Sequence, residues 1–160
     1  MYKTGHYGAA LLLYAPVGVV LLSVDPALAV LGGVGSVGLS RVPDYDLRIP
    51  GLKHSGETHT VAFLCLIAAA LAGLGLLAAD TFGTSPTQTA GLGLVVGVVA
   101  IGSHLAADAL TPAGVPLWWP LSSRRYTVGV TKASNPLANY GLLALGIAVT
   151  VGVGYLAGGV

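Results

Sequence analysis

TAGLGLVVGVVAIGSHLAADAL, residues 89–110, decides the fold of this chain. No charged residue occurs in it before Asp108, and it is long enough to cross the hydrocarbon core of a bilayer, which takes about 20 helical residues. His104 and Asp108 near its end lie one helical turn apart on the same face, a spacing that lets two side chains share one metal ion. A hydrogen-bonded pair at a membrane interface is the equally simple alternative. The stretch therefore predicts a membrane helix with a candidate metal site at its end.

The rest of the chain has the same character. Hydrophobic residues make up 54% and charged residues 8% of the 160 residues, whereas soluble domains carry about a quarter charged residues. We expect an all-α, polytopic transmembrane helical bundle that forms a single domain over residues 1–160. Its predicted membrane segments are 7–24, 27–42, 60–79, 89–110 and 136–158. The second is shorter than a usual span, so whether it crosses fully stays open.

Helix starts are visible at two of these segments. Asp25-Pro26 combines an N-capping carboxylate with a proline at the first helical position. Ser134 or Asn135 before Pro136 repeats the pattern at the last segment.

The basic residues predict the orientation. Five segments place the N-terminus and the connections 41–59 and 111–135 on one side of the membrane, and this side holds every Lys and Arg: Lys3, Arg41, Arg48, Lys53, Arg124, Arg125 and Lys132. The positive-inside rule then predicts a cytoplasmic N-terminus and a candidate site that faces the cytoplasm, in the inner (cytoplasmic) membrane. The net charge of +1 and the lack of a basic stripe argue against a nucleic-acid partner.

Glycine within the segments favours close helix packing. Pairs four residues apart, such as Gly93 with Gly97 and Gly154 with Gly158, let helix backbones approach each other in lipid. Such faces could also support a homo-oligomer. Gly32-Gly33-Val34-Gly35 follows no strand and precedes no lysine, so it is not a nucleotide fingerprint. Cys65 is interpreted as a packing residue.

Metal-ligating side chains gather in three short polar windows. The candidate metal ligands are His6, Asp44, Asp46, His54, His59, His104 and Asp108. This set has nitrogen and oxygen donors but no thiolate, which suits zinc and also manganese or iron. Seven donors exceed the needs of one tetrahedral site, so two ions are predicted. Asp46 is either a ligand or the acceptor for an imidazole N–H.

Other polar side chains are candidates for catalysis. Glu57 could act as a general base. It could instead be a solvated carboxylate or a cap for a helix that begins near Thr58. Arg124 and Arg125 could hold a phosphate or serve as interfacial anchors. Trp118 and Trp119 fit an aromatic belt at headgroup level, where a lipid phosphoester would reach the site.

Several motifs carry a resemblance to a known family. GH at 5–6, VPDYD at 42–46, HSGETHT at 54–60 and GSHLAADALTPAGVPLWWP at 102–120 resemble the YdjM family of membrane-bound proteins, which are described as metal-dependent hydrolases. The resemblance implies a small helical inner-membrane protein with a His and Asp metal site, distantly similar to zinc-dependent phospholipase C and P1-type nucleases. Ser55 stands where the family often has arginine, so another basic residue (Arg48, Lys53, Arg124 or Arg125) would have to bind an anionic substrate.

The function predicted from these observations is metal-dependent hydrolysis inside the membrane. The expected substrate is a phosphoester, on a phospholipid or another phosphorylated lipid, and the expected partner is membrane lipid. Two other classes stay open. A metal transporter would use similar donors but near the bilayer midplane. A noncatalytic scaffold or regulator with a structural metal site would fold around metal without turnover, and the resemblance implies that some family members bind a DNA-damage repressor.

Overall fold

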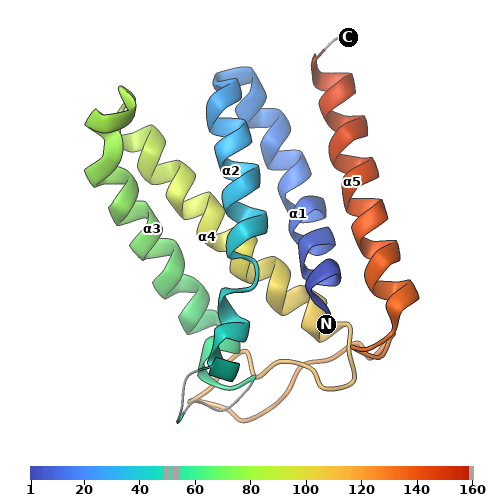
Figure 1. The fold of residues 1–160 in the computed structure, drawn as a ribbon. Helices are drawn as coiled ribbons and strands as arrows, with labels where there is room; N and C mark the ends of the chain where they lie inside the picture. The colour runs from blue at the N-terminus through green and yellow to red at the C-terminus, as the bar shows by residue number, and fades with distance from the viewer. Residues whose placement is uncertain (49–50, 52–54, 159–160) are drawn as a thin grey trace.

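Over the residues that the structure describes, the protein is an up-and-down bundle of five α-helices (Figure 1). The computed structural model describes residues 1–48, 51 and 55–158. The helices are α1 (Lys3–Val24), α2 (Pro26–Leu39), α3 (Val61–Phe82), α4 (Pro86–Ala109) and α5 (Pro136–Gly158). Two 3₁₀ helices, η1 (Val42–Arg48) and η2 (Glu57–His59), lie between α2 and α3. The described residues form no β-strand, only an isolated bridge between Val115 and Tyr126, so the predicted all-α class is confirmed.

Helix lengths refine the predicted membrane segments. Among the described residues, α1, α3, α4 and α5 are long and apolar enough to cross a membrane. α2 has 14 residues and is therefore about 21 Å long, shorter than the ~30 Å hydrocarbon core. α1 begins at Lys3 rather than at the predicted residue 7, so His6 belongs to the helix.

Caps at the helix starts follow the predicted signals. Asp25 Oδ1 accepts a hydrogen bond from the backbone N–H of Ala27 at 2.7 Å, with Pro26 as the first residue of α2. Asn135, rather than Ser134, accepts from the backbone N–H of Leu137 at 3.0 Å. Each cap satisfies backbone groups that would otherwise lack partners.

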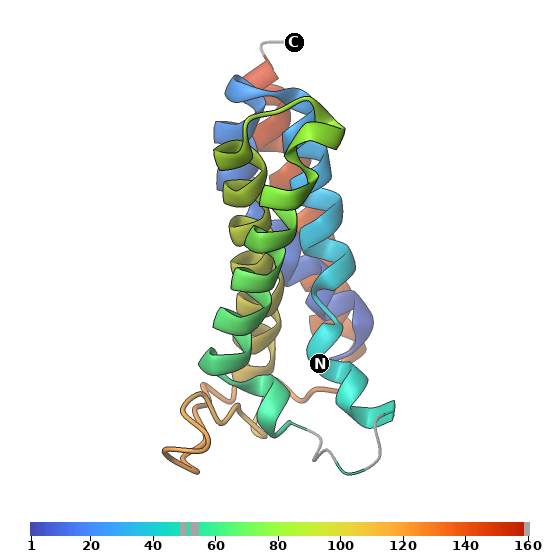
Figure 2. The same ribbon diagram turned by 90° about the vertical axis from the view of Figure 1, so that its left-hand side faces the viewer.

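The direction of the chain alternates from helix to helix (Figures 1 and 2). The N-terminus, both 3₁₀ helices and the connection from α4 to α5 lie at one end of the bundle, and the C-terminus lies at the other. α3 packs on α4, whereas α1 packs on α2, α4 and α5. The polar windows of the sequence thus meet at one end, as five alternating segments predict.

Polarity is inverted relative to a water-soluble bundle. Leu77, Leu137 and Leu156 have about four-fifths of their surface exposed. Conversely, His6, His104 and several other polar side chains are completely buried. Apolar side chains face outward and polar groups face inward, which is the arrangement expected of a bundle whose surroundings are lipid.

Glycines bring α3 and α4 into backbone contact. A Cβ placed on Gly93 would overlap the backbone carbonyl of Leu71, and one on Gly97 would overlap the backbone of Ala68. The Gly93 and Gly97 pair therefore packs against α3 of the same chain. Gly91, on the same helix, has open space where its Cβ would lie.

Gly93→Ala should destabilise the bundle, because the added methyl group forces α3 and α4 apart. We expect a loss of about 1–3 kcal/mol in the free energy of unfolding. Gly91→Ala is the matched control and should be neutral or slightly stabilising, since alanine favours helix. Thermal unfolding in detergent, followed by circular dichroism, compares the two variants. Equal midpoints would contradict the packing described for Gly93.

Candidate metal centre

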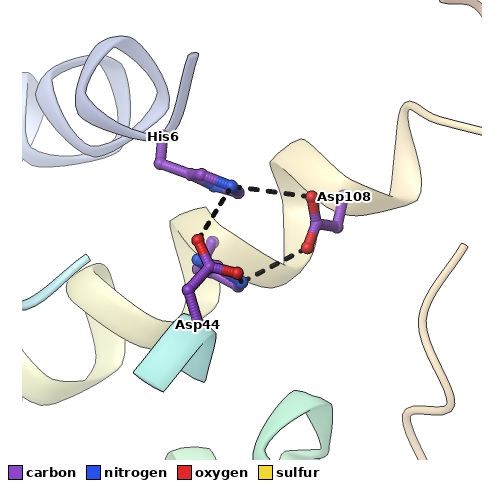
Figure 3. Close-up of side chains that lie close together, drawn as sticks. His6, Asp44 and Asp108 are labelled. Carbon is purple, nitrogen blue, oxygen red and sulfur yellow. Dashed lines mark ion pairs between the residues drawn. The ribbon is translucent and has the colours of Figure 1, made fainter. Parts of the chain in front are cut away.

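Four elements bring the predicted donors to one point at the end of the bundle. His6 lies on the first turn of α1, Asp44 on η1 and His59 on η2, while α4 carries both His104 and Asp108. Figure 3 shows His6, Asp44 and Asp108 pointing toward one another from separate segments. We call His6, Asp44, His59, His104 and Asp108 the donor cluster. His54 lies outside the described residues.

The spacing of the donor atoms matches a metal coordination shell. Nε2 of His59 and Nε2 of His104 are 3.1 Å apart. Oδ2 of Asp108 lies 3.2 Å from Nε2 of His104 and 3.5 Å from Nε2 of His59. Ligands bound to one tetrahedral zinc ion at about 2.0–2.1 Å lie about 3.3 Å from each other. These three donors therefore have the separations that a single small cation requires.

Each carboxylate of the donor cluster faces two sides. Asp44 presents Oδ2 to Nε2 of His6 at 3.8 Å and Oδ1 to Nε2 of His104 at 3.7 Å. Asp108 presents Oδ1 to Nε2 of His6 at 3.6 Å and Oδ2 to His104. Each carboxylate thus contacts the Nε2 atoms of both His6 and His104, whose rings are stacked.

Hydrogen bonding fixes the direction of the His104 lone pair. Nδ1 of His104 lies 2.8 Å from the backbone carbonyl oxygen of Ser40. A carbonyl only accepts, so Nδ1 carries the proton and Nε2 keeps its lone pair toward the donor cluster. His6 stacks on the His104 ring with 4.0 Å between centroids.

The residues present fit a bound cation. Both ring nitrogens of His6 are buried and have no hydrogen-bond partner among the described residues. A buried polar atom without a partner is costly and needs an explanation. Four members of the donor cluster (His6, Asp44, His104 and Asp108) each offer an atom within 4.8 Å of the others. A divalent cation would satisfy the His6 lone pair and offset the two buried carboxylates.

Asp46 has a different position from the other candidate ligands. Its Oδ2 accepts from the backbone N–H of Ser55 and from the hydroxyl of Thr58, both at 3.0 Å, and lies 3.5 Å from Nδ1 of His59. The Thr58 hydroxyl is also 3.0 Å from Nδ1 of His59. This arrangement favours the second of the two predicted roles, because a carboxylate near the outer imidazole nitrogen orients the ligand.

The two arginines after α4 make their contacts with groups other than the donor cluster. Arg125 donates to the backbone carbonyls of Ala113 at 2.6 Å, Gly114 at 2.7 Å and Ser55 at 3.3 Å. Its guanidinium therefore ties the connection after α4 to residue 55, which has a left-handed backbone with φ 54°. Arg124 is exposed over the ring of Tyr126.

Glu57 does not cap α3, and its predicted role as a general base stays a prediction. The cap of α3 is Thr60, whose hydroxyl oxygen accepts from the N–H of Phe63 at 3.0 Å. Glu57 lies on η2 outside the donor cluster, and its Oε2 has no hydrogen-bond partner among the described residues.

Some residues that contact the donor cluster or its supporting residues cannot be identified from a sequence motif. Ser40 contributes a backbone carbonyl, which every residue possesses, and Thr58 acts through a hydroxyl next to a histidine. The Met1 amino group contacts Oδ1 of Asp108. In the sequence, Arg41 indicates only the orientation in the membrane. In the structure, its Nε is buried without a hydrogen-bond partner in the described part of the chain.

Substitutions should separate ligands from the orienting carboxylate. Asp44→Asn and the double variant His104→Ala/Asp108→Ala should lose bound metal, because each removes donors from the cluster. Asp46→Asn should keep the stoichiometry but weaken affinity by about 10–100-fold. Plasma mass spectrometry after zinc titration of detergent-purified protein measures both quantities. Asp80→Asn, at an exposed position on α3, is the control. Unchanged metal content in Asp44→Asn would remove Asp44 from the ligand set.

Comparison with known proteins supports the resemblance seen in the motifs. No curated protein and no solved structure matches the chain significantly. A family model described as "YdjM inner membrane protein" matches residues 1–158, a range that contains the whole donor cluster. The chain therefore belongs to the YdjM family of inner membrane proteins.

Proposed function

We propose that this protein is a membrane-embedded, metal-dependent hydrolase that cleaves a lipid phosphoester. One observation carries the proposal: Asp44 and Asp108 each direct one oxygen toward His6 and the other toward His104. Carboxylates that face two sides suit a pair of neighbouring divalent cations, as in binuclear phosphoesterase sites. Zinc fits the nitrogen and oxygen donors, and manganese and iron fit them as well.

Each residue of the centre has a definable task. A divalent cation supplies Lewis-acid polarisation of a phosphoryl oxygen and acidification of water. Asp44 and Asp108 provide the negative charge that retains the cations. Asp46 and Thr58 hold the ring of His59 in the orientation that points Nε2 inward. His6, His59 and His104 are fully buried, which keeps bulk water away from their rings.

The substrate class follows from the surroundings of the donor cluster. Trp118 and Trp119 are substantially exposed in the connection after α4, and Leu121 is almost entirely exposed. Aromatic side chains at the end of a membrane bundle occupy headgroup level. A phospholipid or another phosphorylated lipid would present its phosphoester at this level without leaving the membrane.

A basic residue for the phosphoryl oxygens can also be proposed. Arg125 has its guanidinium committed to three backbone carbonyls, which favours an anchoring role. Arg41 directly precedes η1, three residues before Asp44, and carries a buried Nε without a hydrogen-bond partner in the described residues. We assign the anion-binding task to Arg41 ahead of Arg124, which is exposed.

The position of the donor cluster argues against transport. Transporters bind their ions near the midplane, at broken helices. Here every donor lies on a 3₁₀ helix or on the end of α1 or α4 that faces the connections (Figure 1). A scaffold with a structural metal site is distinguished from a hydrolase by turnover alone.

Purified protein in lipid nanodiscs should hydrolyse a phosphorylated lipid in the presence of zinc or manganese. Phosphatidic acid tests phosphomonoesterase activity through released phosphate, and phosphatidylglycerol tests diester cleavage through released diacylglycerol. Asp44→Asn should lower the rate by on the order of 100-fold or more, the loss typical of removing a group that stabilises developing charge. Asp80→Asn is the matched control and should retain the rate of the unmodified protein.

A metal-loaded protein without turnover on either lipid class would support the structural-site alternative. Equal rates for Asp44→Asn and the unmodified protein would instead assign the activity to a contaminant.

The site should face the cytoplasm, given that all the basic residues belong to its end of the bundle. Alkaline phosphatase, which is active only outside the cytoplasm, should therefore be active when fused after residue 158. A fusion within the 111–135 connection should be inactive. The reversed pattern would place the metal centre on the outer side, and activity at both positions would indicate that α5 does not cross.

A further inference from the structure

The membrane part of the bundle contains a long apolar groove. α2 and α5 both pack on α1, and the space between them is a cavity of about 670 Å³ floored by α1. Tyr7 and Gly38 border the groove at the end near the donor cluster, and Leu22 and Gly154 border it toward the other end. Figure 1 shows α1 between α2 and α5, all three running from one end of the bundle to the other.

The dimensions of the groove suit a hydrocarbon chain. From Tyr7 to Leu22 it follows α1 for roughly 22 Å, given 1.5 Å per residue. The cavity volume divided by this length gives a mean cross-section on the order of 30 Å², which is that of a narrow, elongated groove. The length also exceeds the ~15 Å depth of one leaflet, so a whole lipid chain fits.

A molecule bound in the groove does not need polar groups to match the lining. It is almost entirely apolar, and its buried hydroxyl groups are satisfied within the protein. Tyr14 donates to the carbonyl of Ala29 at 2.5 Å, and Thr150 donates to that of Leu11 at 3.4 Å. A void of this size would forfeit dispersion contacts along its whole length, so hydrocarbon from the bilayer fills it.

One end of the groove is lined by residues that are close in sequence to the metal centre. Tyr7 follows His6 directly, and Gly38 lies just before Ser40, whose carbonyl accepts from His104. A lipid that enters the groove therefore has its polar end at the level of the donor cluster.

We propose that this groove binds one acyl chain of the lipid whose phosphoester is positioned at the donor cluster. The position of the phosphoester at the donor cluster rests on the proposed hydrolase function, whereas the binding of the acyl chain rests on the groove. The groove thus selects lipid substrates that have a long hydrocarbon chain and fixes the depth of the phosphoester.

Two glycines allow the groove to be blocked without disturbing the helix packing. Gly38 and Gly154 line it, and each has open space within 4 Å of the position that a Cβ would take. Gly38→Phe and Gly154→Phe would fill its two ends. Gly152→Phe is the matched control, since Gly152 lies on the same helix with equally open space but does not line the groove.

Photocrosslinking tests chain binding independently of catalysis. The probe is phosphatidic acid with a diazirine near the methyl end of one palmitoyl chain, mixed into phosphatidylglycerol nanodiscs. After photolysis, mass spectrometry of peptides should find crosslinks concentrated on the groove residues of α1, α2 and α5. Gly38→Phe and Gly154→Phe should each reduce these crosslinks by about tenfold, and Gly152→Phe should leave them unchanged. All variants are first compared for thermal stability.

The outcomes distinguish the groove from the proposed hydrolase function. Asp44→Asn, which lacks turnover, should retain the groove crosslinks. Groove crosslinks without turnover in the unmodified protein would support chain binding and overturn the hydrolase function. Turnover with crosslinks spread evenly over the lipid-facing helix surfaces would overturn the groove proposal and leave the hydrolase function standing. Loss of crosslinks in Gly152→Phe equal to that in Gly154→Phe would also overturn the groove proposal.

Discussion

The structure depends on two carboxylates held close together at one end of a membrane bundle. Asp44 and Asp108 both approach His6 and His104 within 4 Å, in surroundings where an uncompensated charge is expensive. A divalent cation between them would relieve their mutual repulsion, and the histidine nitrogens would complete its coordination shell. The 3₁₀ helices, the hydrogen bond from His104 to Ser40 and the Asp46 contacts all serve to hold this shell in position.

The arrangement of helices explains how donors far apart in the sequence meet. Each helix reverses the direction of the previous one, so α1 begins, and α4 ends, at the same end of the bundle. The connection between α2 and α3 adds η1 and η2 at that end. The short α2 matters here because it leaves the chain inside the bundle end, where η1 can place Asp44 beside the helices.

Much of the fold could be predicted because its signals are local. The Asp25-Pro26 cap and the apolar lengths of the spans depend on neighbouring residues alone, and the structure reproduces them. The sequence predicts a later start for α1 than the structure shows. The residues before Tyr7 are polar, and they hide a helical turn that tertiary contacts stabilise. Spacing alone left the role of Asp46 open, because the direction of a side chain in an irregular segment is set by its partners. The arginine contacts and the groove arise from tertiary packing, which leaves no pattern in the sequence.

The close backbone contacts of the glycines divide the bundle into two stiff pairs. Gly75, Gly93 and Gly97 lock α3 to α4, while Gly8 and Gly146 bring α1 against α5. His6 belongs to one pair, and His104 and Asp108 belong to the other. Binding of an ion by donors from both pairs would therefore be coupled to the docking of the pairs. Under the proposed function, a chain that has inserted into the membrane without docking its two helix pairs would lack a complete centre, so the surrounding lipids would not be cleaved before folding is finished.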